Sequence, residues 1–333
     1  MATFYDRIAE NRRNSFLLAA FVVLLLGALG LTIGWAVTGD PRAAIPSTIG
    51  AIIIGLVAAL ASYFLGDSLV LTVSGAKEVT KESAPQLINV VQEMAIASSV
   101  PMPRVYLIDD TAPNAFATGR DPKHASVAIT TGLLQKLDRE ELQGVMAHEL
   151  SHVRNYDIRF SLMVGVLVGS VALLADFFLR FSFWGGGGRR RGGDRDSGGA
   201  QAVVFLIAIM LAVVAPIAAR LVQLAISRQR EYLADASAVE LTRNPVGLEQ
   251  ALAKIAADQE VLEVANRATQ HLYFENPIKK FEQRSSKLFD THPPVLDRVN
   301  RLRSLSGQAP AQSLEDLLGP PVSPLVGARL EHQ

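Results

Sequence analysis

The sequence predicts a mainly α-helical membrane protein with a small β-sheet, and three observations support this fold class. Of the 333 residues, 49% are hydrophobic and 19% are charged, whereas a typical soluble domain carries roughly 25% charged residues. Four long apolar segments occur along the chain, each close to the length that a bilayer-spanning helix needs. Strand-like runs are short and occur between the second and third of these segments, so we expect a small sheet.

The charge balance gives no indication of a nucleic-acid partner, and the lack of cysteine restricts the kinds of metal site that the chain can form. Lys and Arg total 32, and Asp and Glu also total 32, so there is no basic excess of the kind that indicates a nucleic-acid partner. The chain contains no cysteine, which excludes disulfides and thiolate metal ligands. Any zinc site must therefore be built from histidine and carboxylate side chains.

Residues 1–66 are predicted to contain a transmembrane helical hairpin. Residues 15–37 and 44–65 carry no charge, and each run is long enough to cross the hydrocarbon core, which takes about 20 helical residues. The connection between them contains Gly39-Asp40-Pro41, which is a turn signature. A cleaved signal peptide is the alternative, but its apolar stretch is usually about 7–15 residues long.

The first polar region, residues 67–158, is predicted to mix helices and strands. A helix is expected over residues 84–99, because apolar residues recur there at spacings of three and four. Residues 105–108 and 125–131 have the pattern of short strands separated by turns. Asp138 followed by Glu141 forms a capping-box pattern, which predicts a helix that begins there and continues to Arg154.

Residues 159–226 are predicted to contain a second pair of membrane helices. Residues 160–179 are apolar except for Asp176, and residues 202–219 are uncharged but include Pro216. A loop rich in Gly and Arg separates them at residues 185–199, and this composition favours a flexible connection. A buried hairpin inside a soluble domain is the alternative for this pair.

The second polar region, residues 227–307, is predicted to be helical. The fourth apolar segment can continue as a helix over residues 219–240. Another helix is expected to start at Asn244-Pro245, and a third is expected after Pro293-Pro294. In this last helix Leu296, Val299 and Leu302 share one face. Residues 308–333 are rich in Pro, Gly and Gln and are predicted to form a loose tail.

One short motif in the first polar region indicates a metal centre. His148-Glu149-Leu150-Ser151-His152 is an H-E-x-x-H sequence on the helix predicted to end at Arg154. Residues four apart lie on the same side of a helix, so both imidazoles can bind one zinc ion at about 2.0–2.1 Å. Glu149 lies beside the first ligand, where it can act as the general base that takes a proton from a zinc-bound water. An ordinary amphipathic helix with two solvated histidines is the alternative.

A catalytic zinc site needs a third protein ligand and an open position. Positions 155 and 158 are Asn and Ile, so the extended motif with a third histidine is absent. Glu231 in the second polar region is the predicted third ligand, and Asp235, one turn later, can accept a hydrogen bond from the far nitrogen of a ligand histidine. A surface helix with scattered acidic residues is the alternative. With these roles the two polar regions form the two halves of one catalytic domain.

Four segments in combination resemble the HtpX family of bacterial membrane metallopeptidases, which is related to the CAAX prenyl endopeptidases. They are His-Glu-Leu-Ser-His at 148–152, Ser-Arg-Gln-Arg-Glu-Tyr-Leu-Ala-Asp-Ala at 227–236, Asn-Ala-Phe-Ala-Thr-Gly at 114–119 and Thr-His-Pro-Pro at 291–294. The resemblance covers nearly the whole chain, although the loop at 185–199 is longer than the family requires. It implies a thermolysin-like (zincin) catalytic core, one zinc ion per chain and proteolytic quality control of membrane proteins.

Two further groups have weaker support. The resemblance suggests that Asn114, Ala115, Phe116 and Ala117 bind substrate by backbone pairing at a sheet edge, and a plain structural hairpin is the alternative. His292, before Pro293-Pro294, can donate a hydrogen bond to the oxyanion that forms at the attacked carbonyl; a capping or solvated histidine is the alternative. His124, His271 and His332 are expected to lie at the surface.

The expected partners are protein or peptide substrates, in particular membrane proteins, and the lipid bilayer. Arg7, Arg12 and Arg13 precede the first apolar segment, whereas only Arg42 lies in the following turn. The positive-inside rule then predicts a multi-pass protein of the bacterial inner membrane with its catalytic site on the cytoplasmic side. Several arginines between residues 180 and 199 fall on the opposite side in this topology, and a re-entrant second pair resolves that conflict. The oligomeric state is left open.

A transport or scaffold protein with an incidental H-E-x-x-H is the competing hypothesis. A transporter is expected to place charged groups inside its spans, and residues 15–37 and 44–65 contain none. A metal-binding regulator without turnover is a third hypothesis, which the presence of Glu149 argues against. The sequence therefore favours a metalloendopeptidase.

Overall fold

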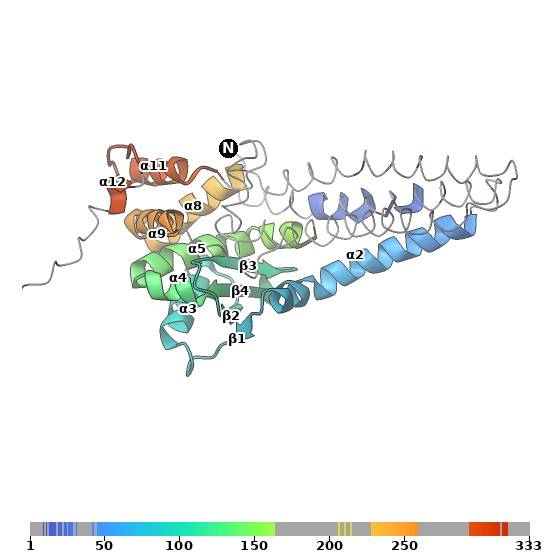
Figure 1. The fold of residues 1–333 in the computed structure, drawn as a ribbon, viewed down its shortest axis with the longest axis horizontal. Helices are drawn as coiled ribbons and strands as arrows, with labels where there is room; N and C mark the ends of the chain where they lie inside the picture. The colour runs from blue at the N-terminus through green and yellow to red at the C-terminus, as the bar shows by residue number, and fades with distance from the viewer. Residues whose placement is uncertain are drawn as a thin grey trace, which may run out of the picture.

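The computed structural model describes residues 45–163, 228–258, 293–313 and 315–318, with scattered positions between 9 and 42 and at 206, 210 and 214. These residues are mostly helical and include one small mixed sheet, as the sequence predicts. Figure 1 shows the long helix α2 (Ile45–Val73) extending away from the part that contains the sheet. The predicted second helix pair and the loop at 185–199 lie almost entirely outside the described residues.

Four strands form the sheet in the order β1-β2-β4-β3. They are β1 (Lys77–Glu78), β2 (Arg104–Ile108), β3 (Ala115–Gly119) and β4 (Ala125–Thr130). Strands β2 and β4 run parallel, whereas β1 and β3 are antiparallel to their neighbours. The two strands predicted at 105–108 and 125–131 are present, and β3 lies at one edge of the sheet.

A tight hairpin joins β3 to β4 through the short 3-10 helix η1 (Pro122–His124). Gly119 closes β3 with a φ of 137°, a backbone conformation that residues with a side chain rarely adopt. A Cβ atom at this position would lie 2.2 Å from the carbonyl oxygen of His124. The glycine therefore allows the close turn that fixes β3 against β4.

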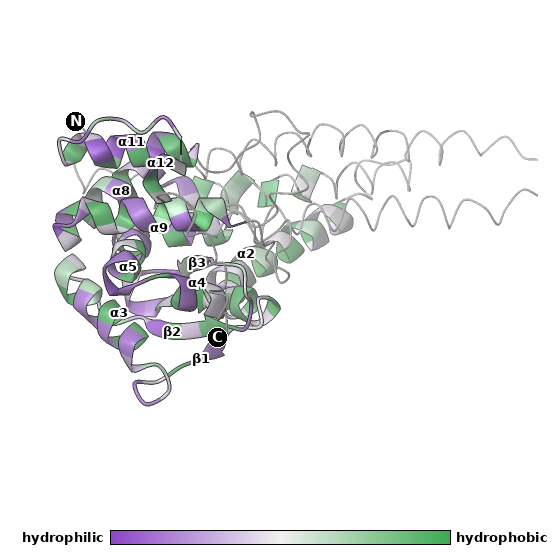
Figure 2. Ribbon diagram, turned by 60° about the vertical axis from the view of Figure 1, so that its left-hand side comes forward, coloured by the Kyte–Doolittle hydropathy of each residue, from purple (hydrophilic) through white to green (hydrophobic). Residues whose placement is uncertain are grey.

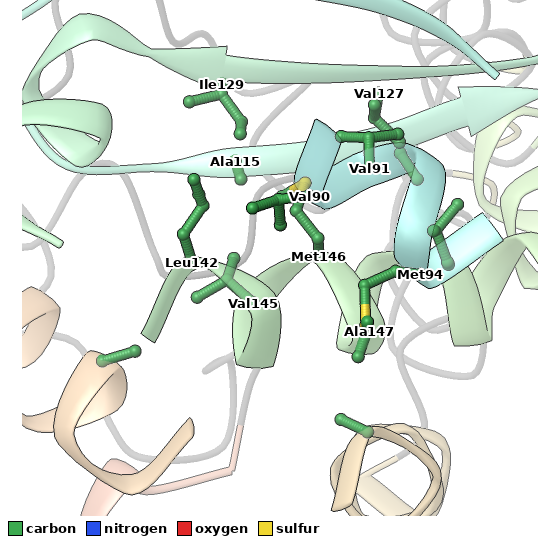
Figure 3. Packing of buried hydrophobic residues seen from close by; sticks show 14 of the residues in the cluster. Val90, Val91, Met94, Ala115, Val127, Ile129, Leu142, Val145, Met146 and Ala147 are labelled. Carbon is green, nitrogen blue, oxygen red and sulfur yellow. The ribbon is translucent and has the colours of Figure 1, made fainter. Parts of the chain in front are cut away.

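Helices α3 (Pro85–Ser98) and α5 (Arg139–Arg154) pack on one face of the sheet, and the short helix α4 (Thr131–Lys136) follows β4. Figure 3 shows their buried apolar side chains, such as Val90, Met94, Val145 and Met146, packed together with residues of the strands. The predicted capping box is present at the start of α5. The Asp138 side chain accepts from the Glu141 N–H at 3.0 Å, and Glu141 Oε2 accepts from the Asp138 N–H at 2.8 Å.

Helices α8 (Arg228–Thr242) and α9 (Pro245–Ala257) pack against α5, and α11 (Val295–Leu305) packs against α8 and α9. The approach of α9 to α5 is close at Gly144, where a Cβ atom would lie 2.8 Å from the backbone nitrogen of Leu248. These contacts bring the two polar regions of the sequence together in one domain.

Residues 308–333 were predicted to form a loose tail, but the first residues of this stretch are bound to the folded domain. The Ala311 N–H donates to Asn300 Oδ1 at 2.7 Å, and Arg303 Nε donates to the Ala309 carbonyl at 2.6 Å. Helix α12 (Glu315–Leu318) then packs against α9. Polar groups of α11 therefore hold this part of the chain, which the composition of the tail did not indicate.

The long apolar helix α2 packs with its C-terminal end against the other face of the sheet. Thr48–Val73 is the one helix among the described residues that is long and apolar enough to cross a membrane, and hydrophobic residues cover much of it in Figure 2. Near its end, Val70 and Leu71 are buried with Phe116 and Leu162. Gly66 also lies close to Leu162, since a Cβ atom there would be 3.1 Å from the leucine side chain. The end of α2 is therefore part of the folded core.

Candidate active site

Two helices bring the predicted metal ligands together. His148 and His152 lie on α5, and Glu231 lies in the first turn of α8. The Nε2 atoms of the two histidines are 3.2 Å apart, and Glu231 Oε1 lies 3.5 Å from His152 Nε2 while Oε2 lies 3.6 Å from His148 Nε2. One ligand atom from each residue thus lies within 4.8 Å of the other two. This spacing suits a single metal ion held by two imidazoles and one carboxylate.

Each histidine has a carboxylate at its far nitrogen. His148 Nδ1 lies 3.0 Å from Asp235 Oδ1, and His152 Nδ1 lies 3.0 Å from Asp157 Oδ2. Such a partner makes Nδ1 the donor and leaves the Nε2 lone pair available to a metal. Asp235 occupies the place predicted from the sequence, whereas Asp157 was not predicted.

Arg298 on α11 is a second buried group that the sequence analysis missed. Its Nε donates to Asp235 Oδ2 at 2.9 Å and its Nη2 donates to Asp235 Oδ1 at 2.7 Å, while its Nη1 lies 3.8 Å from Glu231 Oε2. The arginine side chain is fully buried, so it balances the charge of the two carboxylates inside the protein. One signal was available, because Arg298 lies on the face of α11 that Leu302 occupies four residues later.

The turn after α5 explains how Asp157 comes back toward the metal ligands. Asn155 caps the helix, and Tyr156 follows with a φ of 62°, in the left-handed region. This reversal allows the Asp157 carboxylate to approach His152, five residues earlier in the chain. Arg230 Nε lies 3.7 Å from Asp157 Oδ1, so the carboxylate also contacts the residue before Glu231. No helical periodicity predicts this contact, because the helix is interrupted between the two residues.

The electrostatic environment shifts the pKa values of the central groups. Burial, assisted by the charge of Glu231, raises the pKa of Glu149 above its usual value, although the two histidines act in the opposite direction. Burial lowers the pKa of His152, but the hydrogen bond to Asp157 and the charge of Glu231 outweigh it and raise this pKa to about 9. The site therefore attracts positive charge, which a metal ion can supply in place of a proton.

The pKa values of His148 and Asp235 move in opposite directions. Burial lowers the pKa of His148, but its hydrogen bonds to Asp235 and Glu231 outweigh burial and raise it above the usual value. Burial raises the pKa of Asp235, but Arg298 and His148 outweigh burial and lower it. Asp235 therefore remains a carboxylate that orients His148.

The predicted substrate segment lies beside the general-base candidate. Ala115, Phe116 and Ala117 belong to the edge strand β3, which contacts α5, and all are buried. The backbone of Ala117 lies near the Glu149 carboxylate and lowers the pKa of that group, against the larger effect of burial. Asn114 precedes the strand, where its Oδ1 accepts from the Ala115 N–H at 3.0 Å and its own N–H donates to Thr130 Oγ1 at 2.9 Å. This edge of the sheet therefore lies next to the helix of Glu149.

The remaining predicted histidines are only partly covered by the structure. His292 lies outside the described residues, although the following Pro293, two residues before α11, is buried. His124 is half-exposed in η1 and pairs with Asp121 at 2.8 Å, in agreement with the surface position predicted for it. His271 and His332 also lie outside the described residues.

Comparison with known proteins gives matches over most of the chain. The model of the family described as "Peptidase family M48" matches residues 81–306. A "Protease HtpX homolog" of Ligilactobacillus salivarius (strain UCC118) is 45% identical over 301 residues, covering 90% of this chain and 99% of that protein. A "Protease HtpX homolog" of Streptococcus thermophilus (strain ATCC BAA-250 / LMG 18311) is 46% identical over 304 residues with the same coverage. The crystal structure of S. mikatae Ste24p has a TM-score of 0.44 and 19% identity, covering 90% of this chain and 67% of that chain.

Proposed function

Because this chain belongs to peptidase family M48 and is therefore a metallopeptidase, we propose that it is a membrane-anchored zinc endopeptidase. Its proposed substrates are misfolded or damaged membrane proteins, which it cuts in quality control. The observation that carries the catalytic part of this proposal is the convergence of His148, His152 and Glu231, whose ligand atoms lie within 4.8 Å of one another. A transport or scaffold function leaves this convergence unexplained.

The donor set fits one zinc ion. Two imidazoles and one carboxylate are a common protein ligand set of catalytic zinc, and the chain has no cysteine that could form a thiolate site. The three side chains lie on α5 and α8, so the packing of these helices determines the spacing of the ligands. These residues would hold zinc, which would supply Lewis-acid chemistry at the carbonyl and at a water molecule.

Glu149 is the proposed general base. It follows His148 directly on α5, it is buried, and burial raises its pKa above the usual value, which makes the carboxylate a stronger base. In the proposed reaction it takes the proton of the attacking water and delivers it to the leaving amine. His292 is the proposed oxyanion donor, because it directly precedes the buried Pro293, two residues before α11, the helix that carries Arg298.

The edge strand β3 is the proposed substrate-binding element. An extended peptide paired with the backbone of residues Asn114–Ala117 would lie along α5, and the contact of β3 with α5, the helix of the proposed base Glu149, supports this path. Backbone pairing requires little of the substrate side chains. This mode of binding suits an enzyme that cuts many different unfolded segments.

Helix α2 is the basis for the proposed membrane location. Its apolar side chains are exposed along most of its length, as expected for a surface in contact with lipid tails. Residues 15–37 are the proposed first half of a hairpin with α2, and the described positions among them that are helical support this proposal. The full proposal is a multi-pass protein of the bacterial inner membrane with its catalytic site on the cytoplasmic side and residues 160–179 and 202–219 as a second helix pair.

The proposal is tested with the full-length chain purified in detergent. We expect one zinc per chain and cleavage of casein, with both lost after treatment with a chelator and restored by added zinc. For quality control, a membrane protein and a destabilised variant of it are offered together, and the variant should be cut faster. Casein cleavage that survives complete removal of metal would exclude the proposed mechanism, and equal cutting of the two membrane proteins would exclude the proposed role.

A further inference from the structure

A residue near the N-terminus is buried next to the metal ligands. Asn11 is 2% exposed, although it lies only a few residues before the first apolar segment of the chain. Its side-chain Nδ2 donates to Asp157 Oδ1 at 2.7 Å and to the Asn155 carbonyl at 2.9 Å. These partners lie more than 140 positions away in the sequence, so the contact joins the start of the chain to the end of the metal-binding helix.

The two hydrogen bonds use the full donor capacity of the Asn11 amide. An asparagine NH2 group has two N–H donors, and here one reaches the carbonyl of Asn155, the C-cap residue of α5, and the other reaches the carboxylate after the left-handed Tyr156. The amide therefore bridges both sides of the turn. The turn is thus stabilised by a group from outside the segment that forms it.

The hydrogen bond from Asn11 to Asp157 constrains the orientation of the Asp157 carboxylate. Oδ1 accepts from Asn11, which leaves Oδ2 directed at His152 Nδ1, 3.0 Å away. Asp157 is 6% exposed, so water has little access to compete for its oxygens. Arg230 also lies near Oδ1, at 3.7 Å, and its guanidinium stacks over the Phe160 ring at 4.8 Å. Asn11 is the neutral donor in this group, and it bonds Oδ1 at the shorter distance.

We propose that Asn11 is a positioning residue: it orients the Asp157 carboxylate that orients the His152 ring, and so couples the start of the first apolar segment to the metal site. This inference rests on the proposed role of His152 as a metal ligand. Removing the amide frees the carboxylate to rotate, and the imidazole then loses its fixed orientation toward the ion. The position of the N-terminal segment relative to the catalytic domain thereby affects metal binding.

The test measures metal affinity of the full-length chain in detergent, by competition with a chelator. Asn11→Ala should weaken zinc binding by about tenfold, the lower end of the range for outer partners of a ligand. Asn11→Asp should weaken it further, because it replaces two donors by a carboxylate beside Asp157. Asn14→Ala is the matched control: Asn14 lies three residues later and makes no hydrogen bond to the described residues of the site, so its loss should leave affinity unchanged.

A double-mutant cycle separates positioning from a general effect on folding. If Asn11 acts through Asp157, the double variant Asn11→Ala, Asp157→Ala should bind zinc no more weakly than Asp157→Ala alone. Asp157→Asn takes its place in the cycle if the alanine variant does not fold. The absorption spectrum of the cobalt-substituted chain should also change in Asn11→Ala and not in Asn14→Ala, because it reports the geometry of the ligands.

The outcomes distinguish this inference from the proposed function. An unaltered chain that binds no zinc would overturn the metal site itself. An unaltered chain that binds zinc, with Asn11→Ala equal to Asn14→Ala in affinity and cobalt spectrum, would overturn the role of Asn11 alone. Fully additive losses in the cycle would also overturn it, because they would show that Asn11 does not act through Asp157.

Discussion

Arg298 on α11 and Asp235 on α8 are joined by two hydrogen bonds, Nε to Oδ2 at 2.9 Å and Nη2 to Oδ1 at 2.7 Å. Asp235 in turn lies 3.0 Å from His148 Nδ1. A helix from the C-terminal part of the chain thus orients a histidine that lies 150 positions earlier. The site depends on the packing of three helices as well as on the H-E-x-x-H motif.

Replacing Arg298 should therefore damage both stability and metal binding. Arg298→Met leaves the Asp235 carboxylate buried without its charged partner, which typically costs about 3–5 kcal/mol. We expect a lower midpoint in denaturant-induced unfolding and zinc affinity reduced by about 10–100-fold. Arg301→Met is the control for loss of a charge on α11: Arg301 is exposed and lies over the Tyr232 ring but contacts no carboxylate of the site among the described residues. An equal loss in both variants would contradict the role given to Arg298.

Glu149→Gln should separate metal binding from turnover. The amide keeps the size of the side chain but cannot take a proton, so casein cleavage should fall by about 10²–10⁴-fold while zinc content stays at one per chain. Glu140→Gln on the same helix is exposed and should retain activity. Undiminished cleavage by the Glu149 variant would rule out this residue as the base.

His148→Ala should remove the metal itself. Loss of a direct ligand should lower zinc affinity by more than the roughly 10–100-fold expected for an outer partner, as measured by metal analysis after dialysis. His124→Ala, at a half-exposed position in η1, serves as a matched histidine control and should keep its zinc. Stoichiometric zinc in the His148 variant would exclude the proposed ligand set.

Metal affinity should depend on pH in a defined direction. The pKa of His152 is raised from 6.5 to about 9, so the metal-free site holds a proton at neutral pH that the ion must displace. Affinity should therefore rise by about tenfold per pH unit for each proton displaced, up to about pH 9. For the same reason, protonated His152 stabilises the metal-free fold below its ordinary pKa of 6.5, and this contribution is lost as pH rises through about 9. Chelator competition and thermal unfolding across this range measure both effects, and a flat affinity profile would contradict them.

Gly144→Ala should weaken the contact between α5 and α9. The new methyl group would meet the backbone of Leu248 at 2.8–2.9 Å, and forcing atoms into a packed interface costs about 1–3 kcal/mol. Gly50→Ala is the control, because nothing lies within 4 Å of a Cβ atom there. Equal unfolding midpoints for the unaltered chain and the Gly144 variant would show that the two helices can separate without cost.

Local patterns predicted the individual elements well. The capping box of Asp138 and Glu141 correctly gave the start of α5, and apolar spacing correctly gave α3 and, on α11, the buried Val299 and Leu302 but not Leu296. Such signals are readable because they depend on residues within one or two turns of each other. The coarse fold class, mostly helical with a small sheet, follows from the same signals.

Contacts between distant segments were harder to predict. Glu231 and Asp235 were predicted because metal chemistry needs a third ligand and an outer partner, and the structure brings both next to the histidines. Arg298 and Asp157 were missed, since one comes from a separate helix and the other depends on the left-handed Tyr156. A buried arginine and a reversed turn have meaning only once the helices are placed in space.

Helix α2 runs without interruption from its exposed apolar half to Val70 and Leu71, which are buried against the sheet. A continuous helix of this kind leaves no hinge between its exposed apolar half and the sheet beside the candidate active site. If the apolar half lies in the bilayer, the length of α2 determines the distance between the lipid surface and the bond that is cleaved. Such an enzyme would select the cleaved bond by its distance from the bilayer. In substrates whose juxtamembrane segments are lengthened step by step, the cleavage position should therefore shift along the sequence while its distance from the membrane stays the same.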